Sequence, residues 1–131
     1  MTRDAAAKPR FEAVTPRIPV QDVEAALTFY RNQLGFDLGW KWGTPVTHAN
    51  VCRDSIGLDL IAVAAPSRGT AMAYIQVSGV DAYYSELKAR GVNLGDLGTR
   101  EYGMRDFEVV DPNGNRLAFG EPADLGALHS R

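Results

Sequence analysis

The sequence predicts an α+β fold made of two copies of one unit, in which a strand and a helix are followed by three strands. Two observations carry this prediction. The interval from Val23 to Val80, where two amphipathic helices should begin, equals the interval from Asp54 to Asp111, where two hairpin turns should begin. Apolar residues also change from helical spacing to alternation in the same order in both halves. Neither half can bury its sheet alone, so we expect two βαβββ modules forming a curled mixed sheet around a shared cleft.

The first module is predicted over residues 13–64, after a flexible arm formed by residues 1–12. Its opening strand covers residues 13–20 and contains Pro16 and Pro19. Proline donates no backbone hydrogen bond, so this strand suits a sheet edge or a position across a subunit boundary.

A helix is predicted to follow the opening strand. Asp22 is a favourable N-cap, and Gly35 is placed to end the helix at its C-terminus. Between them one face is apolar, with Val23, Ala26, Leu27, Tyr30 and Leu34. The three strands that complete the module are expected over residues 36–42, 46–53 and 58–64.

The second module is predicted over residues 71–121, after a linker at residues 66–69. Its first strand should cover residues 72–78, and its helix should run from Val80 to Gly91. The next strand, over residues 92–100, is weakened by Gly95 and Gly98 because glycine contributes no side chain to a sheet.

A β-hairpin is predicted around Asp111–Asn115. Pro112 presets φ for a turn, and Asn113 and Gly114 tolerate positive φ. Alternating apolar residues stand on both sides of this turn. Residues 122–131 are then expected to form a tail.

Composition narrows the function. The 131 residues carry a formal charge of −2 and show no basic stripe, which argues against nucleic-acid binding. No apolar run is long enough to cross a bilayer, and the N-terminus lacks the apolar core of a signal peptide. Cys52 is the only cysteine, so no intrachain disulfide can form and a reducing compartment is natural. These features predict a cytoplasmic protein with no membrane partner.

Several segments, in this order and spacing, resemble the vicinal oxygen chelate superfamily, which includes glyoxalase I, extradiol dioxygenases, and fosfomycin and bleomycin resistance proteins. They are Ile18–Val23, Phe29–Tyr30, Leu34–Phe36, Val77–Asp81, Tyr102–Phe107 and Asp111–Leu117. The chain is most similar to the bleomycin resistance branch, because an aromatic-Gly-x-Arg step precedes the final hairpin there. The resemblance implies a homodimer that completes its clefts between subunits, often with exchange of the first strand.

Enzymes of this superfamily hold a divalent metal with four side chains, usually His and Glu. The resemblance carries these positions to Thr15, Asp59 (or Ile61 in another register), Tyr74 and Ala118. None of them is a histidine, and alanine cannot coordinate a metal. The two histidines of the chain, His48 and His129, are placed where one subunit could hardly aim both at one ion. We therefore expect neither a metal nor another cofactor.

Without a metal, the cleft should be concave and mostly apolar, with a few polar groups. Its candidate ligand-binding residues are Trp40, Trp42, His48, Asn50, Tyr74, Gln76, Tyr102, Met104, Arg105 and Phe107. Neighbouring members share strand faces, and their planar rings suit flat or cationic ligands. Tyr102 is favoured because Gly103 lets the backbone approach a ligand closely.

Each candidate also has a structural interpretation. Trp40 and Trp42 suit a core or a dimer interface about as well as ligand stacking. Tyr74 and Gln76 could form the outer face of a strand. The guanidinium of Arg105 could hold a ligand carboxylate or pair with a nearby glutamate.

The first function hypothesis is a metal-independent drug-binding protein of the glyoxalase/bleomycin resistance type. It would sequester a planar cationic antibiotic, or a related small-molecule ligand, in an aromatic cleft at the dimer interface, so we favour binding over catalysis. One alternative is a metal-dependent lyase, isomerase or dioxygenase with diverged ligands. Another is a binder of an unknown metabolite.

Overall fold

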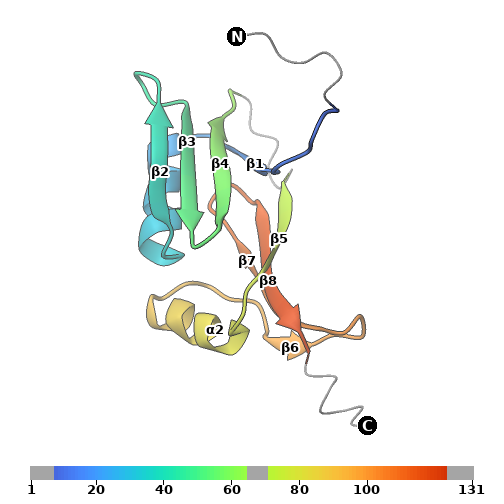
Figure 1. Cartoon of the computed structure of the whole chain (residues 1–131). Coiled ribbons are helices and arrows are strands. Elements are labelled where there is room, and N and C mark those ends of the chain that lie inside the picture. Colours follow the sequence, from blue (N-terminus) through green and yellow to red (C-terminus); the bar gives the residue numbers. More distant parts are fainter. Residues whose placement is uncertain (1–7, 65–70, 124–131) are drawn as a thin grey trace.

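The computed structural model describes residues 8–64 and 71–123. It contains two four-stranded mixed sheets with the same internal order, β1-β4-β3-β2 and β5-β8-β7-β6 (Figure 1). In each sheet the first strand runs parallel to the last, and the other pairs are antiparallel. We call them the N-terminal sheet and the C-terminal sheet. This duplicated topology is the one that the sequence repeat predicts.

The N-terminal sheet is made of β1 (Arg17–Val20), β2 (Asp37–Trp42), β3 (His48–Arg53) and β4 (Ile56–Ala62). Between β1 and β2 the chain forms α1 (Val23–Thr28) and then a π-helical segment, η1 (Phe29–Gln33). Asp22 caps α1 as predicted, since its Oδ1 accepts a hydrogen bond from the backbone N of Ala25 at 3.2 Å.

The C-terminal sheet is made of β5 (Met72–Gln76), β6 (Gly98–Thr99), β7 (Met104–Val110) and β8 (Arg116–Pro122), with α2 (Val80–Ala89) after β5. The strand predicted over residues 92–100 shrinks to the two residues of β6. Before it, the segment bends so that Val92 and Leu94 pack against the core, and only the backbone N of Gly95 bonds to β7, at Glu108 O (3.0 Å).

The first strand is also shorter than predicted. Pairing with β4 begins at the carbonyl of Pro16, which accepts from the backbone N of Asp59 at 2.9 Å, and residues 8–15 lie exposed outside the sheet. The strand order puts β1 at an edge, where Pro19 needs no donor on its free side. The edge position predicted from the prolines is therefore confirmed.

The two hairpin turns differ, although they occupy equivalent places in the repeat. The turn between β3 and β4 has two residues, Asp54 and Ser55, and Asp54 has φ of 51°. The turn Asp111–Asn115, between β7 and β8, is longer and is held by the Asp111 carboxylate. Its Oδ1 accepts from the backbone N of Asn113 (2.8 Å) and of Asn115 (2.9 Å).

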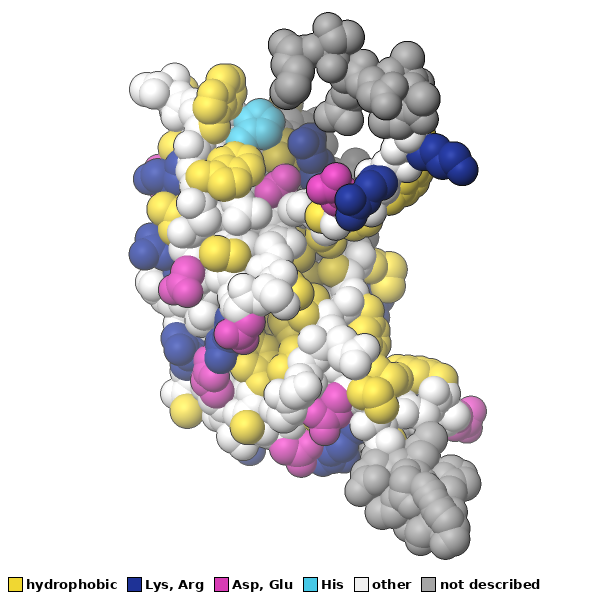
Figure 2. Space-filling model, viewed as in Figure 1, with side chains coloured by type: hydrophobic (Ala, Val, Ile, Leu, Met, Phe, Trp, Pro, Cys, Tyr) yellow, Lys and Arg dark blue, Asp and Glu magenta, His cyan; other side chains and the backbone are white. Residues whose placement is uncertain are grey.

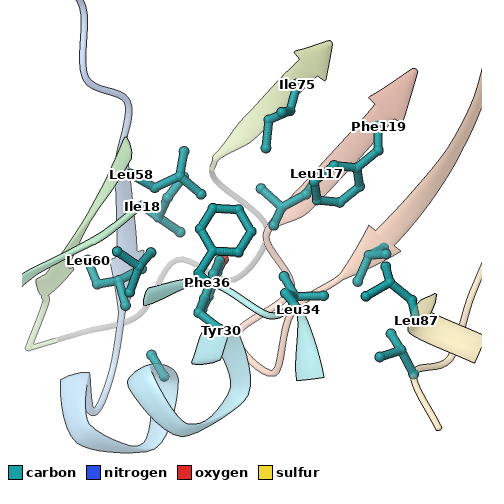
Figure 3. Close-up of a cluster of buried hydrophobic side chains, with 14 of the residues drawn as sticks. Ile18, Tyr30, Leu34, Phe36, Leu58, Leu60, Ile75, Leu87, Leu117 and Phe119 are labelled. Carbon is teal, nitrogen blue, oxygen red and sulfur yellow. The ribbon is translucent and has the colours of Figure 1, made fainter. Parts of the chain in front are cut away.

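One core joins the two halves (Figure 3). Ile18, Leu58 and Leu60 approach from the N-terminal sheet, and Leu117 and Phe119 approach from the C-terminal sheet. Between them lie the side chains of Tyr30, Leu34 and Phe36 (Figure 3). The helices pack on the sides of the sheets that face this core, α1 against β3 and β4 and α2 against β7 and β8.

Each sheet therefore has an inner face in this core and an outer face directed away from it. Strand alternation assigns side chains to one face or the other. The outer faces carry large exposed side chains: Trp40, Trp42, Met72, Tyr74 and Tyr102. In the view of Figure 2, hydrophobic side chains extend over the surface from the N-terminal sheet toward the region of β5. Four of the candidate ligand-binding residues, Trp40, Trp42, Tyr74 and Tyr102, lie on these exposed aromatic faces.

Candidate ligand-binding site

Strands β2 and β3 present two tryptophans and a histidine on the outer face of the N-terminal sheet. The register pairs Trp42 with His48 and Trp40 with Asn50 across the two strands. The Trp42 and His48 rings meet edge to face, with centroids 5.5 Å apart. Trp40, Trp42 and His48 border one open hollow, and the tryptophans are 46% and 65% exposed. The structure thus brings together the predicted residues of this half.

Asn50 is held at the base of the same face. Its Nδ2 donates to Asp59 Oδ1 at 3.0 Å, and Asp59 Oδ2 lies 3.9 Å from Arg17 Nε. A side chain at position 39 would collide with the amide oxygen of Asn50, so Gly39 makes room for this amide beside an irregularity in β2. These contacts hold the amide of Asn50 in one orientation, so it presents a fixed polar group on this face.

The outer face of the C-terminal sheet holds a polar cluster centred on Asp106, whose carboxylate is almost fully buried. Its Oδ2 accepts hydrogen bonds from the hydroxyls of Tyr74 and Tyr102, both at 2.7 Å. Its Oδ1 accepts from Nε of Arg100 at 2.8 Å. The cluster lies in a hollow of about 550 Å³ that Met72 and Ala118 also line. Tyr74 and Tyr102 are 48% and 67% exposed, so their rings remain open to solvent.

A glycine makes this arrangement possible. Tyr74 is on β5 and Asp106 on β7, with β8 between them, and Gly120 of β8 pairs with Asp106. A Cβ at position 120 would collide with the Tyr74 hydroxyl and come within 2.7 Å of Asp106 Cβ. The Tyr74 ring can therefore cross β8 only because residue 120 has no side chain.

The electrostatics of the cluster keep the carboxylate charged. Burial alone would raise the pKa of Asp106, but the hydrogen bonds from Arg100, Tyr102 and Tyr74 outweigh this effect and lower it. Burial, followed by its hydrogen bond to Asp106, raises the pKa of Tyr74. The pKa of Tyr102 is raised first by its own hydrogen bond to Asp106. At neutral pH both phenols are therefore protonated and point their protons at one carboxylate.

Two predicted residues lie on the inner face instead. Phe107 is 1% exposed and packs in the core, stacked on Phe119 with centroids 5.6 Å apart. Arg105 pairs with Asp81 of α2, with Nε 2.7 Å from Oδ1 and a terminal nitrogen 3.0 Å from Oδ2. Alternation places both opposite Asp106. Phe107 and Arg105 therefore do not lie on the outer face with Tyr74 and Asp106.

The other two candidates lie at the margins. Met104 begins β7 and is half-buried, and Gln76 ends β5 and is exposed. Gln76 borders a different hollow, of about 450 Å³, between the β3–β4 turn and the start of α2. There Arg53 forms a bidentate pair with Glu86, at 2.8 and 2.9 Å. Alternation keeps both residues on the outer face, Gln76 two residues after Tyr74 and Met104 two residues before Asp106, but neither borders the hollow around Asp106.

Arg100 and Asp106 are the site residues that sequence reasoning missed. Asp106 stands in a strand that also carries Arg105 and Glu108, so nothing in its composition marked this one charged residue as buried. Arg100 belongs to a segment in which a strand was expected but a tight turn occurs, with the backbone N of Arg100 donating to Met104 O at 2.7 Å. The available signal was the alternation itself, which puts Asp106 on the face of Met104 and opposite Phe107.

The register also corrects the positions compared with the metal sites of related enzymes. In the N-terminal sheet the register partner of Asp59 is Arg17, and in the C-terminal sheet the register partner of Ala118 is Tyr74. The residue equivalent to Tyr74 is therefore Arg17, and not Thr15 as the sequence comparison suggested. Over residues 8–64 and 71–123, no group of three or more His, Cys, Asp or Glu side chains could hold a metal ion. His129 lies outside the described residues.

Within the part of the chain that the structure describes, no helix is long and apolar enough to cross a membrane.

Comparison with known proteins gives concordant results. The model of the Glyoxalase/Bleomycin resistance protein/Dioxygenase superfamily matches residues 10–119. A bleomycin resistance protein of Geobacillus stearothermophilus is 28% identical over 129 residues, covering 79% of this chain and 92% of that protein. Bleomycin resistance proteins of Staphylococcus aureus match to the same extent.

Two solved structures show the range of proteins with this fold. The bleomycin-binding protein from bleomycin-producing Streptomyces verticillus, complexed with copper(II)-bleomycin, has a TM-score of 0.75 and 27% identity, covering 86% of this chain and 97% of that one. A lactoylglutathione lyase from Agrobacterium tumefaciens has a TM-score of 0.71 and 20% identity, covering 87% and 96%. At that identity the second likeness concerns the fold alone.

Proposed function

The chain belongs to the glyoxalase/bleomycin resistance protein/dioxygenase superfamily. We propose that it is a drug-binding protein that sequesters a planar, cationic antibiotic or a related small molecule. Binding would protect by removing free drug, with no bond made or broken. The proposal draws on the bleomycin resistance proteins among its relatives and on the copper(II)-bleomycin complex of a protein that is 27% identical.

The observation that carries the proposal is the pair of uncovered aromatic faces. Trp40 and Trp42 stand on the outer face of one sheet, and Tyr74 and Tyr102 stand on the outer face of the other. Large exposed aromatic surfaces are typical of binding sites, and flat cationic ligands stack well on such rings.

We propose that the cleft forms between two copies of the chain. Within one chain the inner faces share a core, and the two aromatic groups border separate hollows, Trp40 and Trp42 one and Tyr74 and Tyr102 the other, so they do not enclose a ligand together. If the N-terminal sheet of one copy faces the C-terminal sheet of another, each cleft gains two tryptophans and two tyrosines. A symmetric dimer would contain two such clefts.

The arm before β1 supports this assembly. Phe11 is 102% exposed and Val14 is 91% exposed, so neither side chain is used in the single chain. In Figure 1 the described part of this segment, residues 8–15, leads away from β1 outside the N-terminal sheet. Because β1 itself pairs with β4 of its own chain over Arg17–Val20, we propose that the exchanged segment is the arm ahead of it.

Titration calorimetry with metal-free bleomycin tests the drug assignment. We expect saturable heat with one ligand per chain, and a loss of affinity in Trp42→Ala. Lys41→Ala is the matched control, since Lys41 is the next residue on β2 and its side chain pairs with Glu24 of α1. Absence of heat at high micromolar drug would reject bleomycin as the ligand. Equal losses in both variants would reject the outer face as the site.

The matching family model, whose name also covers glyoxalases and dioxygenases, supports one alternative, a metal-dependent lyase, isomerase or dioxygenase with diverged ligands. Asp59 supplies a carboxylate at the compared position, but its register partner is the cationic Arg17. Metal analysis of the purified protein separates the two functions. Stoichiometric Zn²⁺, Ni²⁺, Mn²⁺ or Fe²⁺, removable by a chelator with loss of activity, would establish the alternative.

A further inference from the structure

The cluster around Asp106 has a definite hydrogen-bond direction. A carboxylate has no proton to give, so the hydroxyls of Tyr74 and Tyr102 must both donate to Oδ2, each at 2.7 Å. A phenol has one proton and two acceptor lone pairs. Once that proton is committed to Asp106, each hydroxyl can offer a ligand only its acceptor side.

The neighbouring charges are already paired, so net charge does not decide what the hollow accepts. Arg100 donates to Asp106 through Nε, and one terminal nitrogen bonds the carbonyl oxygens of Asp96 (2.6 Å) and Asp106 (3.0 Å). On the other side, Arg116 donates to Glu108 through two nitrogens, at 2.9 and 3.1 Å. The side chains of Tyr74 and Tyr102, which are 48% and 67% exposed, border the hollow between these two pairs, and each phenol oxygen keeps lone pairs that its own proton does not use.

The hollow is built for this arrangement. Gly120 leaves the path across β8 open for the Tyr74 ring, as a Cβ there would collide with the hydroxyl. Gly103, with φ of 88°, turns the chain after Tyr102, so that this ring reaches the same oxygen from the other side. Two rings from separate segments thus converge on one buried carboxylate.

We propose that Tyr74 and Tyr102 form a paired hydrogen-bond acceptor that selects flat ligands presenting N–H donors, such as amidinium, guanidinium, amine or amide groups, and that Asp106 acts as the positioning residue that fixes this direction. The selection deepens the proposed function, since it names the chemical face by which the C-terminal sheet would hold a ligand. The selection by Tyr74 and Tyr102 requires only the C-terminal sheet, so it can be tested without the drug and without a second copy of the chain.

The test uses two fragment-sized probes of the same shape. Benzamidine carries only donors on its charged group, and benzoate carries only acceptors. We expect benzamidine to shift the ring signals of Tyr74 and Tyr102 in NMR titrations of the full chain. Benzoate should bind at least about tenfold more weakly, because a tenfold difference in affinity corresponds to roughly one unmatched hydrogen bond. Equal binding of the two probes would overturn the proposal.

Variants separate selection from structure. Tyr74→Phe and Tyr102→Phe each remove one oxygen, keep the ring, and should lower benzamidine affinity by up to about tenfold without changing benzoate. Asp106→Asn supplies both a donor and an acceptor, so the phenols can rotate and the preference for benzamidine should fall. Tyrosinate absorbance gives a second readout, because Tyr74 and Tyr102 should titrate at lower pH in Asp106→Asn.

The outcomes distinguish this inference from the drug assignment. If benzamidine is selected and bleomycin gives no heat, the drug assignment fails and the acceptor pair stands. If bleomycin binds with unchanged affinity in the Tyr74→Phe/Tyr102→Phe double variant, the drug assignment stands and the acceptor pair is refuted. If Asp106→Asn fails to fold, the two phenylalanine variants decide alone.

Discussion

A buried hydroxyl links the two halves of the molecule at the level of a single residue. Tyr30 is fully buried, and its hydroxyl donates to Asp111 Oδ2 at 2.8 Å, from η1 to the hairpin of the other sheet. Burial, followed by the charge and the hydrogen bond of Asp111, raises the pKa of Tyr30 far above the physiological range. This tyrosine therefore serves the core as a neutral hydrogen-bond donor.

Tyr30→Phe should destabilise the protein by about 1–3 kcal/mol, the cost of leaving a buried charged acceptor with one partner fewer. The measurement is urea unfolding at neutral pH. Tyr84→Phe is the control, since Tyr84 is half-buried and packs its ring against Phe107. Similar stability losses in the two variants would show that the bond to Asp111 adds nothing.

Glu86 gives a pH dependence at the same scale. The hydrogen bond from Arg53 outweighs partial burial and lowers the pKa of Glu86 below its ordinary 4.5. A depressed folded-state pKa means that the stabilisation is complete above the ordinary value and is lost as the pH falls through the folded-state value. Between neutral pH and acid, the free energy of unfolding should therefore fall more steeply in the wild type than in Glu86→Gln.

Chemical denaturation at a series of pH values below 5 checks this slope. Glu24→Gln is the control, because its pair with Lys41, at 3.6 Å, is solvent-exposed and worth little. If Glu86→Gln keeps the full wild-type slope, the interaction between Arg53 and Glu86 does not contribute to acid sensitivity.

At the scale of elements, α2 begins without the usual capping side chain. Its N-cap is Gly79, and the missing acceptor comes from β8: Glu121 Oε1 accepts from the backbone N of Gly79 at 2.6 Å and of Val80 at 3.1 Å. A carboxylate here also complements the positive end of the helix. Strand β8 thus completes a helix that lies about forty residues before it, as a distant cap rather than a local one.

Glu121→Ala should cost about 0.5–2 kcal/mol, the range for losing an N-cap. Glu121→Gln should recover part of the loss, because the amide oxygen can still accept while the charge is gone. Native-state hydrogen exchange at Gly79 and Val80 localises the effect. Unchanged protection of these two amides in Glu121→Ala would contradict the capping role.

The elements also show what the sequence could predict. Apolar periodicity and the repeat predicted both helices and the final hairpin, because these depend on local spacing. Pro16 and Pro19 predicted the edge position of β1, because proline has no backbone donor. Alternation puts Asp106 opposite Phe107, but it could not show that the Tyr74 ring reaches this carboxylate from β5. That contact crosses β8 at Gly120, which no local pattern records.

The same reasoning explains the shortened strand before β7. Leu94 and Leu97 have the apolar character of a strand but pack against the core from an irregular segment. Glycines at 95 and 98 give that segment the freedom to bend. The repeat predicted where the two turns begin but not how long they are. Asp54 and Asp111 occupy equivalent places, and the turns that they begin differ in length.

At the scale of the whole molecule, the arm before β1 should control association. Phe11→Ser combined with Val14→Ser should weaken dimerisation while leaving the fold intact, because both side chains are fully exposed in the single chain. Sedimentation velocity measures the change. Val110→Ser, at an exposed apolar residue at the end of β7, is the control. A monomer–dimer equilibrium unchanged by the double variant would rule out the arm as an association element.

The separation of the tryptophan and tyrosine hollows within one chain has a consequence for protection in the cell. If every binding cleft needs one wall from each of two chains, drug capture depends on the square of the chain concentration when dimers are scarce. Halving expression would then lower the amount of drug that the protein can bind by more than half. A chain with a defect in one wall of the cleft could also be rescued by a chain with a defect in the other wall. Co-expression of Trp42→Ala with Tyr74→Ala would restore one intact cleft in each mixed dimer.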